Sequence, residues 1–218
     1  MGCSVSLSDF STDPRNKLID IWEKHMHMEF EAKDVSETMA TMCAGPIINH
    51  VPTMSGGVGY DEVRSFYKHH FIHANPSDCK ISLVSRTVDT TEGQIVDEMI
   101  FSFTHSTQMD WMLPGITPTY RPVQIPLVVV VKFCGSKISA ERVYWDQASV
   151  LLQLDLLPNA LNLPVLGAET AHKILYPSLP ARELGSWKTV SEAELAEGKS
   201  ADEVVAGKAK GEGAKAME

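Results

Sequence analysis

The pattern of apolar residues changes near residue 78, and this change restricts the fold more than any other feature of the sequence. Before it, apolar side chains recur every three or four positions, as at Leu18, Trp22 and Met26, which predicts amphipathic helices. After it, apolar and polar residues alternate, which predicts strands. Helices followed by a run of strands indicate an α+β domain with an antiparallel meander.

Three helices and one short strand are expected before the change. Asp13 and Asp34 stand where an N-cap is expected, at the starts of the first and second helices. A short strand is expected over 46–51. The glycine-rich stretch 54–59 after it is expected to be a loop, and it matches no phosphate-binding or dinucleotide-binding motif. The third helix is expected over 60–73.

Four strands and a final helix are expected after the change. They are predicted over 80–89, 94–106, 124–134 and 138–146, with the helix over 147–157. We therefore expect a flexible N-terminus over 1–11, one domain over 12–180 and a charged low-complexity tail over 181–218.

The charge of the chain restricts its partners. The formal net charge is −9, and the stretch from Ser186 onward, with five lysines and seven acids, accounts for only −2 of it. The domain itself is therefore acidic, which argues against nucleic-acid binding. No apolar run is long enough to span a membrane, no secretory signal is visible, and the four cysteines lack zinc-site spacing, so we expect a cytoplasmic protein. Gly2 and Cys3 fit an acylation pattern, with chance as the alternative.

Three residues at strand ends are the main catalytic candidates. His50 precedes the glycine-rich stretch and His105 precedes a Pro/Gly loop, and a histidine there suits proton transfer near neutral pH. The alternative for each is a structural hydrogen bond to a loop. Asp146 follows Tyr144 and Trp145, where lost hydration favours proton transfer. The alternative is that Asp146 caps the helix after it.

Two other carboxylates and a histidine pair have less specific surroundings. Glu98 shares strand parity with apolar residues, so it is either an inward-facing acid or an ion-pair partner at an interface. Asp110 lies in the strand-rich half of the chain. His69 and His73 have the spacing of a zinc pair, but no third ligand is evident, and we expect no metal site.

Several short stretches occur together in a recognisable order. They are Phe103–Ser106, Leu113–Thr119, Gly135–Ile138, Glu141 and Tyr144–Gln147. In order and spacing they resemble the SnoaL-like branch of the nuclear-transport-factor-2-like (NTF2-like) superfamily, over about residues 12–160.

The resemblance implies a cone-shaped, curved antiparallel sheet wrapped around N-terminal helices, the α+β barrel of that superfamily, with an apolar pocket inside. It also implies a homodimer formed through the sheet face, and acid–base catalysis without a cofactor, as in polyketide cyclases and ketosteroid isomerases. We expect a small apolar carbonyl substrate, polyketide-like or terpenoid-like, that is cyclised, isomerised, dehydrated or opened as a lactone. The alternative is a non-catalytic small-molecule-binding or scaffold module.

Under this interpretation His105 and Asp146 exchange protons with the substrate and His50 orients or polarises its carbonyl. The remaining candidates are substrate-binding residues, for whose aromatic members plain core packing is the alternative. They are Glu98, Asp110, Trp111, Tyr60, Tyr67, Trp145, Trp22 and Met26.

Overall fold

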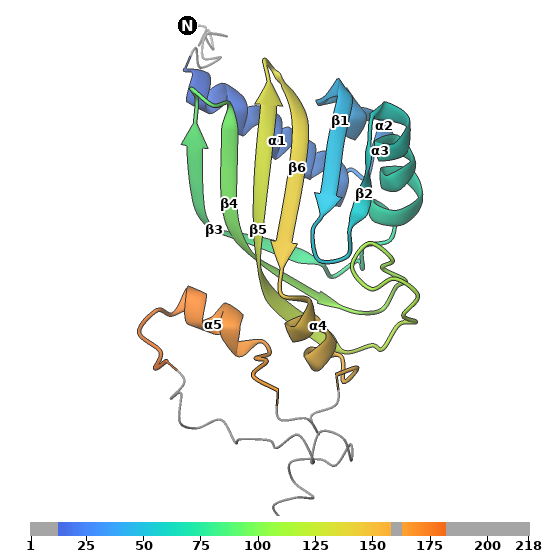
Figure 1. Cartoon of the computed structure of the whole chain (residues 1–218), viewed down its shortest axis with the longest axis vertical. Coiled ribbons are helices and arrows are strands. Elements are labelled where there is room, and N and C mark those ends of the chain that lie inside the picture. The colour runs from blue at the N-terminus through green and yellow to red at the C-terminus, as the bar shows by residue number, and fades with distance from the viewer. Residues whose placement is uncertain (1–12, 158–162, 182–218) are drawn as a thin grey trace, which may run out of the picture.

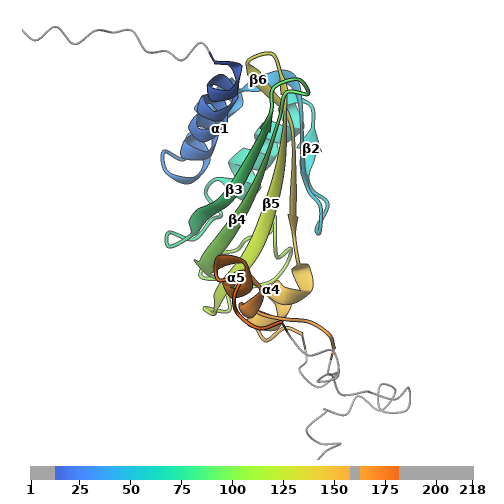
Figure 2. The same ribbon diagram turned by 90° about the vertical axis from the view of Figure 1, so that its left-hand side faces the viewer.

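A six-stranded sheet carries its long N-terminal helix on one face, and the two last helices lie at one end of the strands (Figures 1 and 2). The computed structural model describes residues 13–157 and 163–181. The strands are β1 (Met42–His50), β2 (Ser55–Val58), β3 (Lys80–Asp89), β4 (Gln94–Thr104), β5 (Pro122–Cys134) and β6 (Lys137–Trp145), and they lie in the order β2-β1-β6-β5-β4-β3.

The sheet confirms the predicted α+β class and differs from the expected sheet in two respects. Neighbouring strands are antiparallel except β1 and β6, which run parallel, so the sheet is mixed. It is also open, because β2 and β3 are its two edges. The meander β3–β6 was predicted from alternation, whereas the docking of β1 against the last strand depends on tertiary contacts alone.

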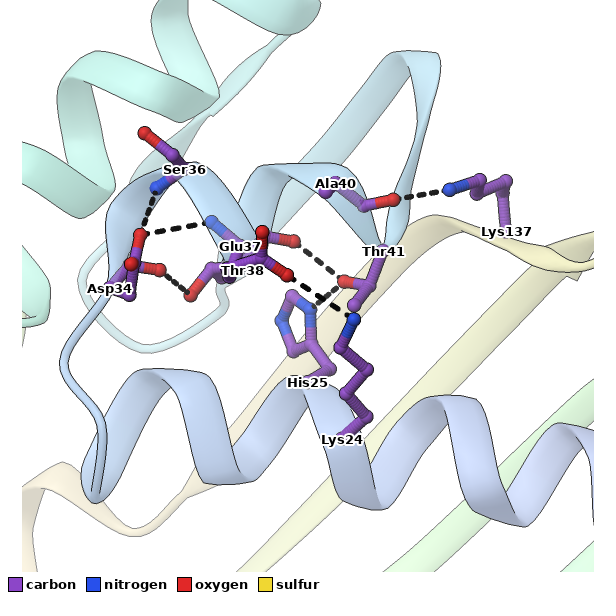
Figure 3. Close-up of polar contacts among 9 residues, drawn as sticks. All are labelled: Lys24, His25, Asp34, Ser36, Glu37, Thr38, Ala40, Thr41 and Lys137. Atoms are coloured by element: carbon purple, nitrogen blue, oxygen red, sulfur yellow. Dashed lines mark hydrogen bonds and ion pairs between the residues drawn. The ribbon is translucent and has the colours of Figure 1, made fainter.

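The helices are α1 (Pro14–Phe30), α2 (Val35–Ala40), α3 (Tyr60–Phe66), α4 (Gln147–Gln153) and α5 (Glu169–Leu175), with a π-helical turn, η1 (Tyr67–Phe71), after α3. Both expected N-caps are confirmed: Asp13 accepts a hydrogen bond from the Arg15 amide, and Asp34 accepts from Ser36 and Glu37 (Figure 3). A side-chain oxygen at these positions satisfies amides that the first helical turn leaves free.

Two local predictions were wrong. The third helix does not run as α-helix to residue 73, because it widens into η1 after Phe66. The glycine-rich stretch is not a loop: β2 pairs with β1, and Gly57 lies so close to α3 that a Cβ there would stand 2.8–2.9 Å from Glu62 and Val63 atoms. A run of small residues shows no alternation of apolar and polar side chains, so the sequence pattern did not predict this strand.

The inner face of the sheet supplies most of the core. Ile95, Met99, Phe101, Ile125 and Val129 alternate inward from β4 and β5 and pack against α1 and η1. A buried ion pair fixes α1 to this face, because both carboxylate oxygens of Asp97 accept hydrogen bonds from Arg86 at 2.8 Å and one also accepts from Trp22 Nε1.

Some predictions concern residues that the structure does not describe. Acylation at Gly2 and Cys3, the flexible N-terminus and almost all of the charged tail lie outside the described residues. Within 13–157 and 163–181, no helix has the length and apolar character needed to cross a membrane.

Candidate active site

An apolar cavity lies between α1, η1 and the inner face of the sheet. The space between its lining atoms, with the open solvent at its mouth included, is about 490 Å³. The cavity volume in which a water molecule can be centred is about 40 Å³. That room suits a few waters, and a metabolite requires its walls to move apart. Five of the residues singled out in the sequence line it: Trp22, Met26, His50, Tyr67 and Trp111.

Three buried ionisable side chains meet at one wall of the cavity. His25 Nε2 lies 3.0 Å from Glu29 Oε1, 3.1 Å from Glu141 Oε1 and 3.1 Å from the Tyr67 hydroxyl. Glu29, Tyr67 and Glu141 line the cavity, and His25 lies behind them. We call His25, Glu29, Glu141 and Tyr67 the carboxylate cluster.

The orientation of His25 is set by a chain of hydrogen bonds (Figure 3). The Thr41 hydroxyl donates to the Thr38 carbonyl at 2.6 Å and therefore accepts from His25 Nδ1 at 2.5 Å. This fixes a proton on Nδ1 and turns Nε2 toward the two carboxylates.

Charge in the cluster is unbalanced. Burial by itself lowers the pKa of His25, but the charges of Glu141 and Glu29 outweigh it and raise that pKa to about 10. Burial also raises the pKa of Glu29, and it holds the pKa of Tyr67 well above its ordinary value, so the phenol remains a donor.

One carboxylate oxygen of the cluster lacks a hydrogen bond. The single proton on His25 Nε2 is aligned with Glu29, and Glu141 Oε1, although only 3.1 Å away, receives no hydrogen bond from residues 13–157 or 163–181. This buried oxygen therefore has acceptor capacity that the described residues leave unused.

The other polar group of the cavity is His50, which sits among aromatic rings. The ring centroids of Trp111, Phe66 and Phe71 lie 4.9–5.3 Å from that of His50, and Trp145 lies 5.9 Å away. Burial in this apolar setting lowers the pKa of His50 to about 3, so the imidazole is neutral at physiological pH.

An open groove adjoins the cavity on the side of α1 and β3. Met26, Phe30, Ile81 and Met99 line both, while Glu23, Arg86 and Asp97 line the groove and not the cavity. The cavity and the groove therefore share an apolar wall that contains two flexible methionine side chains.

The structure does not bring His105 and Asp146 to the cavity wall. Asp146 is exposed, and it accepts hydrogen bonds from Ala148 and Ser149 as the N-cap of α4, which is the alternative stated above. His105 is buried behind the loop after β4, where its Nδ1 accepts from the Thr119 amide at 3.2 Å. Asp146 therefore acts as a helix cap, and His105 makes a structural hydrogen bond to the loop.

Four substrate-binding candidates also lie outside the cavity lining. Glu98 points to the opposite face of the sheet and accepts from Ser85, because strand parity places Asp97 inward instead. Asp110 accepts from Gln108 and from the Gly115 amide, contacts that lower its pKa and tie the loop together. Tyr60 is exposed on α3. Trp145 packs behind His50 and donates to Gln147.

The carboxylate cluster was not predicted, although two signals pointed to it. His25 and Glu29 are four residues apart on the apolar face of α1, where polar side chains are unusual. Glu141 shares strand parity with Val143 and Trp145, which places it on the inner face of β6. Neither signal by itself brings helix and strand together.

The cluster also has the donor types of a metal site. His25, Glu29 and Glu141 each offer one ligand atom, and these atoms lie within 4.8 Å of one another. A protonated His25 and a divalent cation compete for this position, since imidazolium cannot act as a ligand.

No protein-family model and no curated protein matches the chain. Among solved structures, a candidate polyketide cyclase from Acidithiobacillus ferrooxidans is 16% identical with a TM-score of 0.52, over 69% of this chain and 98% of that one. A candidate SnoaL-like polyketide cyclase from Jannaschia sp. CCS1 is 13% identical with a TM-score of 0.51, over 69% and 100%. TsrD from Streptomyces laurentii is 14% identical with a TM-score of 0.50, over 66% and 98%. At these identities the likeness shows a shared fold and not a shared activity.

Proposed function

Since the chain has the SnoaL-like fold of the NTF2-like superfamily, we propose that it is an acid–base enzyme acting on a small apolar carbonyl compound without a metal or organic cofactor. The observation that carries the proposal is Glu141 Oε1, a buried carboxylate oxygen without a hydrogen bond at the wall of an apolar cavity. Two of the solved structures of this fold are described as candidate polyketide cyclases, which is consistent with a polyketide-like substrate.

The proposed reaction begins with proton abstraction from the carbon next to the substrate carbonyl. Glu141 Oε1 takes the proton, and the electron pair moves onto the carbonyl oxygen to give an enolate. The Tyr67 hydroxyl, which burial keeps protonated, donates a hydrogen bond to that oxygen. The imidazolium of His25 stabilises the carboxylates before the transfer. Return of the proton to another carbon of a conjugated enolate completes an isomerisation. In a cyclisation the enolate carbon instead bonds to the carbon of a second carbonyl, whose oxygen takes the proton back from Glu141.

The proposal assigns proton transfer to Glu141 rather than to His105 and Asp146, because Glu141 lines the cavity and the other two do not. The test is hydrogen–deuterium exchange at the acidic carbon of 2-tetralone in D₂O, followed by NMR. Wild-type protein is expected to accelerate exchange, and Glu141→Gln to reduce the acceleration about 100-fold or more.

Matched controls are Glu37→Gln, an exposed carboxylate on α2, and Asp146→Asn, and both are expected to retain exchange activity. Unchanged exchange in Glu141→Gln would contradict the proposed base. Loss of activity on removal of metal by a chelator, with recovery on adding Zn²⁺ or Mn²⁺, would contradict the cofactor-independent part and favour a metal held by the cluster.

A non-catalytic binding or scaffold module is the second candidate, and the small room inside the cavity favours it. Under this alternative, 2-tetralone or a similar ketone binds with no acceleration of exchange above the rate in buffer.

We further propose that the chain forms a homodimer through the outer face of the sheet. Pro126, Val128 and Val130 of β5 point outward there, with Tyr144 of β6 and Ile47 of β1 beside them. Figure 1 is drawn from this side, with α1 behind the strands and no helix in front of their upper parts. Glu98, opposite Val128, and Arg142, opposite Val130, share this face, and a mixture of apolar and charged side chains is typical of association surfaces.

A further inference from the structure

The imidazole of His50 carries one polar atom that nothing in the described residues satisfies. Nδ1 is buried and has no hydrogen-bond partner, and the residue lines the cavity. The rings around it are those of Phe66, Phe71, Trp111 and Trp145, none of which offers an acceptor or a charge. An unpaired buried polar atom costs free energy unless a ligand or a water supplies its partner.

The position of the proton on the His50 ring determines which kind of ligand group can bond to Nδ1. Ser55 pairs with His50 across β1 and β2, and its backbone raises the pKa of the ring, as an acceptor facing a ring N–H does. Nδ1 has no partner, and the donating nitrogen is therefore Nε2. In a neutral imidazole with its proton on Nε2, Nδ1 is an acceptor. His50 is thus unsuited to polarise a carbonyl, which needs a donor, and suited to receive a hydroxyl.

His50 and the carboxylate cluster stand at a defined separation. β1 and β6 are parallel neighbours in which Ile48 lies opposite Glu141 and His50 lies opposite Val143. Both His50 and Glu141 face inward, so they are one strand and two residues apart. Two residues along a strand span about 6.6 Å and neighbouring strands lie about 4.8 Å apart, so the two backbone positions are about 8 Å apart, which is comparable with the length of a fused ring system.

We propose that the cavity selects a hydroxylated ring compound, with one hydroxyl donating to His50 Nδ1 and the acidic carbon held at Glu141. The contact of the acidic carbon with Glu141 rests on the proposed function. The contact of the hydroxyl with His50 rests on the geometry of His50 alone. The aromatic rings around His50 provide flat apolar contact for the ring that carries the hydroxyl. Phenolic and other hydroxylated polycyclic carbonyl compounds have this combination of features.

The experiment compares 2-naphthol with its methyl ether, 2-methoxynaphthalene, which has the same ring system and no donor. Dissociation constants are measured by calorimetry for the wild-type chain, His50→Phe and Glu141→Gln. Wild-type protein is expected to prefer 2-naphthol about tenfold, the effect of one hydrogen bond to a buried acceptor. His50→Phe is expected to abolish the preference, and Glu141→Gln to retain it.

Three outcomes would overturn the proposal: binding of neither compound, equal binding of both by wild-type protein, or a preference that His50→Phe keeps and Glu141→Gln loses. The last outcome would place the hydroxyl on the carboxylate cluster. If the His50→Phe variant does not fold, ¹⁵N NMR of the histidine rings in the wild-type chain replaces it. Nδ1 of His50 is expected to shift with 2-naphthol and not with the ether, and an unchanged signal contradicts the contact, leaving a bound water as its partner.

The results of the naphthol binding experiment can be distinguished from those of the 2-tetralone exchange experiment. If His50→Phe loses the preference for 2-naphthol and the wild-type chain does not accelerate 2-tetralone exchange, the hydroxyl contact is supported and the proposed enzymatic function is contradicted. Exchange that depends on Glu141 without any naphthol preference supports the enzyme and contradicts the hydroxyl contact.

Discussion

At the scale of single residues, two histidines, His50 in the cavity wall and His25 behind it, are held in opposite charge states by their neighbours. His25 faces two carboxylates, and their charges raise its pKa to about 10 despite burial. His50 faces only uncharged rings, and burial lowers its pKa to about 3. The same side chain therefore supplies a fixed positive charge at one wall and a neutral acceptor at the other.

The state of His50 predicts how stability depends on pH. Its pKa is lower in the folded chain than the ordinary value of 6.5, so its contribution to stability is complete above pH 6.5. Between pH 6.5 and about 3 the unfolded chain takes up a proton that the folded chain does not, and the contribution is lost. Denaturant unfolding of the wild-type chain is therefore expected to weaken more steeply over this range than that of His50→Phe.

The control for this measurement is His69→Phe, since His69 is exposed on η1. The control is expected to follow the wild-type curve. A His50→Phe curve parallel to that of the wild type at every pH would show that His50 takes up its proton in the folded chain.

Asp97 carries a second residue-level prediction. Its carboxylate is buried and is shared between Arg86 and Trp22, so Asp97→Asn removes the buried charge opposite the guanidinium and leaves it the exposed Glu23 as an ion-pair partner. The loss of stability is expected to be on the order of 3 kcal/mol, measured by urea unfolding. Glu37→Gln, which removes an exposed ion pair with Lys24, is expected to cost less than about 1 kcal/mol. Equal losses in the two variants would contradict the role given to Asp97.

At the scale of elements, two irregular segments shape the cavity. η1 is a π-helical turn in which the Ile72 amide bonds to the Tyr67 carbonyl, and it carries Tyr67 and Phe71 into the cavity wall. Such turns are frequent at functional sites because they change the direction of side chains within a helix. β2 is the second irregular segment: it pairs with β1, the strand that carries His50, and rests against α3.

The contact between β2 and α3 predicts a cost for adding one methyl group. A Cβ at Gly57 would lie 2.8 Å from the Glu62 carbonyl carbon and 2.9 Å from the Val63 nitrogen, and backbone yields little. Gly57→Ala is therefore expected to destabilise the fold by about 1–3 kcal/mol in urea unfolding.

Gly45→Ala in β1 is the matched control, because an added Cβ there meets no atom within 4 Å. It is expected to leave stability within about 0.5 kcal/mol of the wild type. A Gly57→Ala variant as stable as this control would mean that β2 and α3 are farther apart in solution.

At the scale of the whole molecule, the open sheet has two faces with different tasks. The inner face packs against α1 and η1 and holds the cavity. The outer face presents half-exposed apolar residues of β5, with Tyr144 and Ile47 42–43% exposed. A face of this composition is expected to be covered by a second copy of the chain.

The proposed dimer predicts the effect of a charge on the outer face. Val128→Asp is expected to convert dimer to monomer in size-exclusion chromatography with light scattering, since an unpaired carboxylate resists burial. Leu83→Asp, an exposed apolar residue in the groove beside α1, is the control and is expected to leave the dimer intact. A wild-type chain that is monomeric at every concentration would contradict the proposal.

The sequence by itself determined the class of the fold and most of its elements. The caps at Asp13 and Asp34 and the alternation of β3, β4, β5 and β6 are local properties, set by hydrogen bonding within one turn and by the two-residue period of a strand. They were therefore readable without a structure.

Only the tertiary structure decided which polar residues share the cavity. Glu141 and His25 are 116 positions apart, on a strand and a helix, and nothing in the periodicity of either element says that they meet. Asp146 had equal local reasons to be an acid or a cap, and the start of α4 directly after it made it the cap. A site of this kind is a set of long-range contacts, and its composition follows from packing rather than from spacing along the chain.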